Sequence, residues 1–286
     1  SPSFQTTLGA NPVSPPGVYV ADPSARVWKD GKIYLYGSRD ENCAYYCSNE
    51  LVALSTENLK DWVLHKGLLR SDESQEAIQG TNSFLFAPDC MYRDGQYFLY
   101  FCTPDKNYPE GVAVSHSPIG PFTDTKQLDV LGFNEIDPAV FIDDDGQAYY
   151  LWGQFSLKMA KLSSDMKSLD QGSLIKDVLT EKEHHFHEGA FLFKRKELYY
   201  LVFSDISRAD MPTCLGYATS QSPTGPYDYR GVIIDNRMCN PGNWNNHGSI
   251  AHFNDEWYVI YHRSTHGSNT MRKTCLEPIH FEEDGS

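Results

Sequence analysis

The sequence lacks any run of about 18 uninterrupted apolar residues, the length that a membrane-spanning helix needs. Its opening letters, SPSFQTTLGANPVSPP, have neither the charged nor the apolar region of a signal peptide. Basic residues are scarce, because 24 Lys and Arg stand against 38 Asp and Glu, a formal net charge of −14. Such a surface repels phosphate backbones and anionic membranes, so we expect neither nucleic acid nor membrane as a partner. We expect a monomer.

The cysteine content also argues against a full disulfide framework. The cysteines number seven, an odd count spread over 286 residues, and most are expected to be buried or free thiols. Pairing of Cys43 with Cys47, or of Cys214 with Cys239, stays open. The only histidine cluster, HHFH at 184 to 187, lacks a second close ligand pair, so no structural zinc is predicted.

No convincing helical period appears, whereas Tyr and Phe together number 33, which favours strands. One pattern recurs five times: a short strand, a polar turn and a second strand rich in Tyr, Leu, Ile and Val. The copies are DPSARVWKDGKIYLYG from Asp22, FAPDCMYRDGQYFLYF from Phe86, DPAVFIDDDGQAYYLW from Asp137, EGAFLFKRKELYYLVF from Glu188 and HGSIAHFNDEWYVIYH from His247.

Three of these turns carry Asp-Gly, which supplies the positive φ angles of a tight hairpin. A weaker third strand follows four of the hairpins, so the repeat is a propeller blade. The sequence predicts an all-β fold, a five-bladed β-propeller, with residues 1–286 forming one domain. A β-sandwich is disfavoured because its first strands would share no anchor position. The tail EPIHFEEDGS stops inside what looks like another hairpin, so continuation of the natural chain past Ser286 stays open.

The first residues of the five copies are expected to meet around one central cavity, because the innermost strands of a propeller converge on its axis. Three of them are carboxylates, Asp22, Asp137 and Glu188, and the other two are Phe86 and His247. Clustered acids raise one another's pKa values and cost stability, so such a group points to chemistry rather than to structure. Taken singly, each Asp-Pro would be an ordinary turn opener.

Carboxylates in a cleft lined by aromatic rings suit glycoside hydrolysis, in which one acid protonates the leaving oxygen and a second carboxylate activates water or attacks the sugar. The side chains that could line such a cleft are Tyr45, Tyr46, Trp152, Trp244 and His247. The expected walls are the loops at 43–47 and 72–83.

Over almost its whole length the chain resembles glycoside hydrolase family 43, through ADPSARVWKDGKIYLYGSRD, FAPDCMYRDGQYFLY, NEIDPAVFIDDDGQAYYLWG, HEGAFLFKRKELYYLVFS and NWNNHGSIAHFNDEWYVIYHR. The resemblance implies a five-bladed propeller acting on arabinose- or xylose-containing polysaccharides, or on galactose. It implies inversion, with Asp22 as general base, Glu188 as general acid and Asp137 as the residue that tunes pKa and orients the acid.

The resemblance also implies a set of substrate-binding residues. Phe86 would form an aromatic wall, Arg272 would reach the sugar and the acid, and His247 would lie near a calcium ion held largely through water. Ile136 stands where some xylosidases carry an aromatic residue, which argues against a pure β-xylosidase. The expected substrate-binding residues are Phe86, Ile136, Trp152, His247 and Arg272.

The function expected from these features is exo-acting or debranching removal of terminal α-L-arabinofuranose from plant polysaccharide fragments. β-D-Xylosidase and β-D-galactofuranosidase or galactosidase activities are close alternatives, and a catalytically silent carbohydrate-binding propeller is the rival of another class. A protein-interaction propeller would not need clustered acids. Because polysaccharide lies outside the cell, a secreted or periplasmic location is expected.

Overall fold

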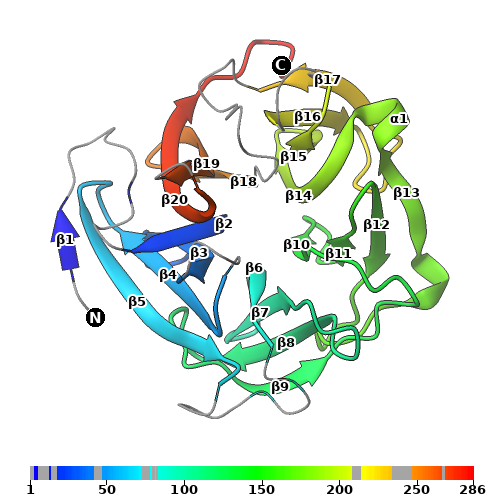
Figure 1. Ribbon diagram of the computed structural model, residues 1–286. Coiled ribbons are helices and arrows are strands. Elements are labelled where there is room, and N and C mark those ends of the chain that lie inside the picture. Colours follow the sequence, from blue (N-terminus) through cyan, green and yellow to red (C-terminus); the bar gives the residue numbers. More distant parts are fainter. Residues whose placement is uncertain are drawn as a thin grey trace.

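The computed structural model describes residues 3–5, 13, 18–41, 47–72, 78, 81, 83–207, 214–233, 247–265 and 268–286. These residues form five antiparallel sheets arranged around a common centre, as Figure 1 shows. The predicted five-bladed β-propeller is confirmed. No helix among the described residues is long and apolar enough to cross a membrane.

Each blade is a sheet of strands that follow one another along the chain. Blade 1 has the spatial order β1-β5-β4-β3-β2, and the remaining blades run in sequence order. The strands of blades 1 and 2 are β1 (Ser3–Gln5), β2 (Tyr19–Val27), β3 (Ile33–Asp40), β4 (Glu50–Thr56), β5 (Asp61–Arg70), β6 (Phe86–Arg93), β7 (Gln96–Cys102), β8 (Glu110–Ser115) and β9 (Thr123–Gln127).

The later blades repeat this plan, with two short helical turns in the connections. Their elements are β10 (Ala139–Ile142), β11 (Ala148–Trp152), β12 (Ser156–Lys161), η1 (Gln171–Ser173), β13 (Ile175–Thr180), α1 (Glu181–His184), β14 (Phe186–Arg195), β15 (Leu198–Asp205), β16 (Cys214–Ser220), β17 (Asp228–Val232), β18 (Gly248–Phe253), β19 (Glu256–Thr265) and β20 (Ser268–Ile279). Within the tail predicted to begin another hairpin, residues 277–279 form the end of β20, which pairs with β19.

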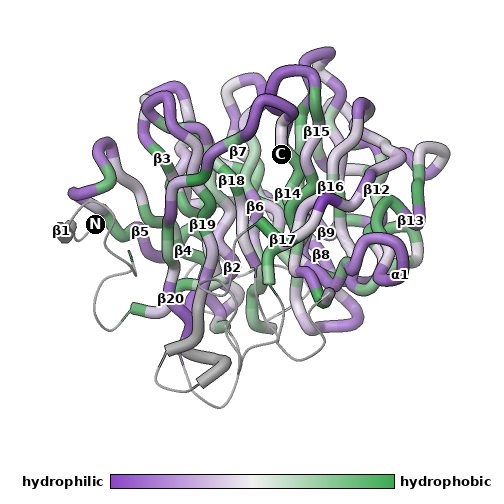
Figure 2. The backbone as a smooth tube through the Cα atoms, turned by 90° about the horizontal axis from the view of Figure 1, so that it is seen from above, coloured by the Kyte–Doolittle hydropathy of each residue, from purple (hydrophilic) through white to green (hydrophobic). Residues whose placement is uncertain are grey.

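The predicted hairpins form at the Asp-Gly turns. Gly31, Gly95 and Gly146 have φ angles of +77°, +82° and +87°, which L side chains rarely adopt. The turns between strands are hydrophilic, whereas apolar stretches run along the strands (Figure 2). Strand composition follows position, because β4 is buried along its whole length while the outermost β9 is mostly exposed.

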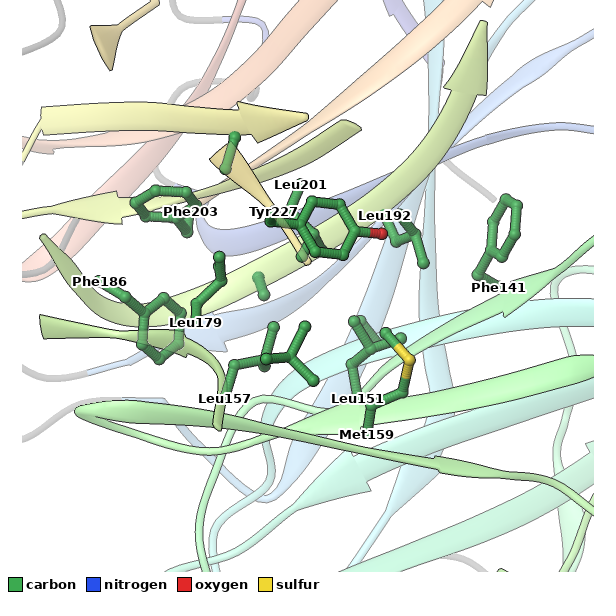
Figure 3. Packing of buried hydrophobic residues seen from close by; sticks show 14 of the residues in the cluster. Phe141, Leu151, Leu157, Met159, Leu179, Phe186, Leu192, Leu201, Phe203 and Tyr227 are labelled. Carbon is green, nitrogen blue, oxygen red and sulfur yellow. The ribbon is translucent and has the colours of Figure 1, made fainter. Parts of the chain in front are cut away.

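The core consists of layers between neighbouring blades rather than one central mass. In the layer between blades 3 and 4, Leu151 and Met159 pack against Leu192 and Leu201 (Figure 3). The starts of the five inner strands, β2, β6, β10, β14 and β18, lie around the axis of the propeller. The ring closes between blades 5 and 1, where the Ser249 hydroxyl accepts from the Ala25 N–H at 2.9 Å and donates to the Pro23 carbonyl at 2.9 Å.

The cysteines follow the sequence prediction in most cases. Among the described residues, Cys47, Cys90, Cys102 and Cys275 form no disulfide, and all are buried. The alternative pairing of Cys43 with Cys47 is therefore wrong. Cys214 is disulfide-bonded, and its expected partner Cys239 lies outside the described residues.

Candidate active site

The inner strands begin with a shared backbone feature. Asp22, Ala87, Asp137 and Gly189 all have positive φ angles, of 52°, 35°, 62° and 67°. Asp tolerates this left-handed conformation better than most residues, and Gly adopts it freely. The turn-based alignment is thus displaced by one residue in blades 2 and 4. Glu188 precedes the left-handed position that Asp22 and Asp137 occupy, so it approaches the axis from a different backbone position.

Asp22 is a buried carboxylate surrounded by donors and cations. Its carboxylate lies 3.5 Å from Nη1 of Arg272 and 3.5 Å from Nδ1 of His247, and the Ser38 hydroxyl donates to it at 3.3 Å. Its backbone N–H donates to Nδ1 of His262 at 2.8 Å. Burial alone would raise the pKa of Asp22, but the charge of Arg272, together with His247, His262 and the hydrogen bond from Ser38, outweighs it and lowers the pKa to about 2. Asp22 is therefore ionised at any ordinary pH.

Arg272 is fixed by a second carboxylate. Its Nε and Nη2 donate to the two oxygens of Asp40, each at 2.9 Å, and its backbone N–H donates to Asp40 at 2.8 Å. The guanidinium also contacts Sγ of Cys47 at 3.4 Å. The side chains of Arg272 and Asp40 are both buried, at 2% and 0% exposure. This bidentate pair holds the guanidinium rigidly beside Asp22.

Asp137 and Glu188 form a second pair of buried acids with the opposite electrostatics. Burial raises the pKa of Asp137, and the charge of Glu188 raises it further. Burial and the charge of Asp22 raise the pKa of Glu188 to about 7, although Arg272 and a hydrogen bond from Gln154 oppose the rise. The site thus combines one carboxylate that is always charged with a carboxyl that keeps its proton to near neutral pH, the division of roles that acid–base chemistry requires.

Gln154 and His187 flank Glu188. The Gln154 amide donates to Oε2 of Glu188 at 3.1 Å, and Nε2 of His187 lies 3.9 Å from Oε1. Burial lowers the pKa of His187, so this imidazole is neutral near pH 7. The backbone of Gln154 is itself anchored, because its N–H donates to Glu135 at 3.0 Å. Glu188 therefore sits in a preformed polar setting.

His247 packs on the backbone beside Glu188. A Cβ at Gly189 would lie 2.9 Å from Nδ1 of His247, so only glycine allows the imidazole this position. Calcium prefers six to eight oxygen ligands. The described part of the chain contains no group of three or more His, Cys, Asp or Glu side chains able to hold a metal ion. Calcium held through His247 and water stays a prediction.

The predicted substrate-binding residues divide into two groups. Trp152 is fully buried, packs its ring against Tyr150 at 5.5 Å and donates its indole N–H to the Phe133 carbonyl at 2.8 Å. It is a core residue, and the expectation that it lines the cleft is wrong. Phe86 and Ile136 are half-buried at the inner ends of their blades, next to the left-handed positions.

Sequence reasoning missed several groups around the acids. Asp40, Gln154 and His262 stand outside the anchor column of the repeat, at the end of β3, in the loop between β11 and β12 and inside β19, and no spacing connects them to it. Only the fold brings them together. The possible lining residues Tyr45, Tyr46 and Trp244 lie outside the described residues, as do most positions of the two predicted wall loops.

Comparison with known proteins shows to which family the chain belongs. The family model for glycosyl hydrolases family 43 matches residues 10–286. The chain belongs to this family. It is therefore a glycoside hydrolase, as predicted. A xylosidase/arabinosidase from Thermoclostridium stercorarium is 29% identical over 96% of this chain, which spans 65% of that protein's length.

Two further family relatives match nearly end to end. A xylosidase/arabinosidase 43A from Humicola insolens is 28% identical over 94% of this chain and 95% of its own. The crystal structure of a β-xylosidase/α-arabinofuranosidase from a compost microbial metagenome, in complex with xylotriose and in a calcium-free form, has a TM-score of 0.81. It is 29% identical, and the match covers 99% of this chain and 97% of that one.

Proposed function

We propose that this family 43 enzyme is an exo-acting, inverting glycosidase that releases terminal α-L-arabinofuranosyl or related residues from plant polysaccharides or oligosaccharides. The observation that carries the proposal is the pKa separation between ionised Asp22 and protonated Glu188 in one buried site. β-D-Xylosidase activity is the nearest alternative, because relatives over nearly the whole chain are named for both xylosidase and arabinosidase activity. β-D-Galactofuranosidase or galactosidase activity follows it.

In this mechanism Asp22 is the general base. Its pKa of about 2 keeps it ionised, so it accepts a proton from a water molecule that attacks the anomeric carbon. Glu188 is the general acid and delivers its proton to the glycosidic oxygen as the bond breaks. Inversion requires the two carboxyl groups to stand about 6.5 to 9.5 Å apart, with room for the water.

Asp137 takes the supporting role. It is coupled to Glu188 by charge, and it accepts a hydrogen bond from the Gly189 backbone, the residue after the acid. Burial and the charge of Glu188 raise the pKa of Asp137 to about 8, so the two carboxyl groups titrate as a pair, and an ionised Asp137 favours the protonated form of Glu188. Arg272 acts on Asp22 and, by its charge, opposes the pKa rise of Glu188. We propose that Arg272 orients the general base Asp22 and the bound sugar.

The test is hydrolysis of p-nitrophenyl α-L-arabinofuranoside, β-D-xyloside, β-D-galactofuranoside and β-D-galactoside by the wild type, Asp22→Asn and Glu188→Gln. We expect release from one sugar, with a loss of about 10²–10⁴-fold in Asp22→Asn. Glu188→Gln should lose less on this activated leaving group than on an oligosaccharide, because p-nitrophenolate leaves without a proton. Proton NMR of the first product should show the inverted anomer. A retained anomer, or full activity in Asp22→Asn, would contradict the assignment.

A further inference from the structure

Phe155 is an unusual surface residue. It is 54% exposed, and among the described residues only Val27 is another exposed large hydrophobic side chain. Single exposed apolar residues are common and need no explanation. Phe155, however, also has a φ of +66°, a left-handed conformation that bulky residues rarely adopt. Such strain persists only where the surroundings impose it, and it gathers at functional sites.

Contacts with blade 4 and the helical turn before it hold Phe155 in place. Its N–H donates to the His187 carbonyl at 2.7 Å, and its own carbonyl accepts from the Glu181 N–H at 3.2 Å. Its ring meets the His187 ring edge-on, with centroids 5.3 Å apart. The backbone is therefore fixed on both sides, and one surface of the aromatic ring is left in solvent.

This ring contacts His187, a side chain that flanks Glu188. The supporting imidazole of His187 lies 3.9 Å from Oε1 of Glu188, and the residue before Phe155, Gln154, donates to Oε2 at 3.1 Å. Phe155 comes from the loop between β11 and β12 in blade 3 and leans on blade 4. Asp22 belongs to blade 1, so Phe155 is linked to the acid through Gln154 and His187 rather than through the residues that surround the base.

In an inverting glycosidase the base and the acid act on opposite sides of the anomeric carbon, and the leaving group lies on the side of the acid. We propose that Phe155 is a stacking platform for the leaving-group sugar, a pyranose ring such as the xylose of a xylan backbone, and so selects substrates by the sugar that departs when the bond is cut. An exposed aromatic face suits the apolar face of a sugar ring. The inference rests on the proposed function.

The experiment compares two leaving groups on one released sugar. For arabinofuranose the substrates are an arabinofuranosylated xylotriose and 2,2,2-trifluoroethyl α-L-arabinofuranoside. For xylose they are xylobiose and trifluoroethyl β-D-xyloside. Trifluoroethanol needs protonation by the acid but is too small to cover a ring. The variants are Phe155→Ala, Phe155→Gly and Phe155→Tyr. Gly relieves the φ strain while removing the ring, and Val27→Ala is the control for loss of an exposed apolar side chain.

We expect Phe155→Ala and Phe155→Gly to lose about tenfold in kcat/KM on the oligosaccharide, the size of one aromatic contact, and less than about twofold on the trifluoroethyl glycoside. Phe155→Tyr should stay within about twofold on both, and Val27→Ala should match the wild type. Equal losses on both substrates would show that the ring only supports Glu188, and no loss on either would show an idle surface residue. Both outcomes overturn the platform while leaving the proposed function intact. A wild type inactive on every substrate overturns both.

Discussion

The guanidinium of Arg272 contacts both carboxylate oxygens of Asp22 at 3.5 Å, deep in the blade 5 to blade 1 junction. Glu188 has a different setting, because it receives one neutral donor from Gln154, and burial and the charge of Asp22 outweigh the opposing charge of Arg272. The pKa values of these two carboxyl groups therefore differ by about five in the folded protein, since that of Asp22 is about 2 and that of Glu188 is about 7. The fold creates this difference largely by placing one buried cation beside the base.

The alkaline side of the pH–rate profile should report the proton on Glu188. With a pKa of about 7, kcat/KM on an oligosaccharide is expected to be flat in mildly acidic solution and to fall tenfold per pH unit above neutrality. The pKa of Asp137 is itself raised to about 8 by burial and by the charge of Glu188, so the two carboxyl groups titrate as a pair. Asp137→Asn leaves Glu188 to titrate alone and should move this limb to lower pH. An unmoved limb in Asp137→Asn would show that Asp137 keeps its proton while Glu188 ionises and does not influence the acid.

Asp40 should matter for stability although it lies outside the repeat pattern. Asp40→Asn deprives the buried Arg272 of its bidentate partner, and breaking a buried pair on one side costs about 3 kcal/mol of unfolding free energy. Urea denaturation measures it. The control is Glu57→Gln, which breaks the exposed Lys32–Glu57 pair and should leave the midpoint unchanged. Equal midpoints for the two variants would mean that Asp22 alone compensates Arg272.

The fold was predictable because its signals repeat. Asp-Gly turns, aromatic strands and a common anchor appear in successive copies, so errors in one copy are corrected by the others. The acids Asp22, Asp137 and Glu188 followed from the same column. The one-residue displacement at Glu188 was not predictable, because turn lengths differ between blades and only backbone angles reveal it. Trp152 illustrates a second limit, since an aromatic residue looks the same in sequence whether it lines a cleft or fills a core.

Glu188 should cost stability in proportion to its raised pKa. The unfolded carboxyl ionises near pH 4, whereas the folded one holds its proton to about pH 7. Between these values ionisation favours unfolding, so the contribution of Glu188 to stability falls as the pH rises from about 4 to about 7 and returns as the pH falls back to about 4. Glu188→Gln lacks this loss and should exceed the wild type by on the order of 3 kcal/mol at pH 8, but not at pH 4.

Asp22→Asn is a control in which the change in stability is expected to have the opposite sign. The folded pKa of Asp22 is lowered, so its charge stabilises the fold above pH 4, and that contribution disappears as the pH falls toward 2. This variant should be less stable than the wild type at pH 7, with a gap that closes in acid. Chemical denaturation at several pH values gives both curves. Parallel curves for Glu188→Gln and the wild type would rule out a raised pKa at Glu188.

Gly189 and Gly31 offer a matched pair for testing how tightly His247 is held. Both have left-handed backbones, at φ +67° and +77°, so an alanine at either position costs about 1 kcal/mol in backbone strain. The new Cβ meets nothing within 4 Å at Gly31, but at Gly189 it lies 2.9 Å from Nδ1 of His247. Gly189→Ala should therefore lose about 1–2 kcal/mol more than Gly31→Ala in urea denaturation.

The same substitution should separate activity from stability. His247 lies 3.5 Å from Asp22, and the Gly189 N–H donates to Asp137, so a displaced imidazole disturbs both sides of the acid cluster. We expect Gly189→Ala to lower kcat/KM by about tenfold or more at a temperature where it remains folded, because small misplacements of reacting groups are costly. Gly31→Ala should retain wild-type activity. Equal activities would mean that the ring moves aside freely and that its contact with Asp22 does not set the charge of the base.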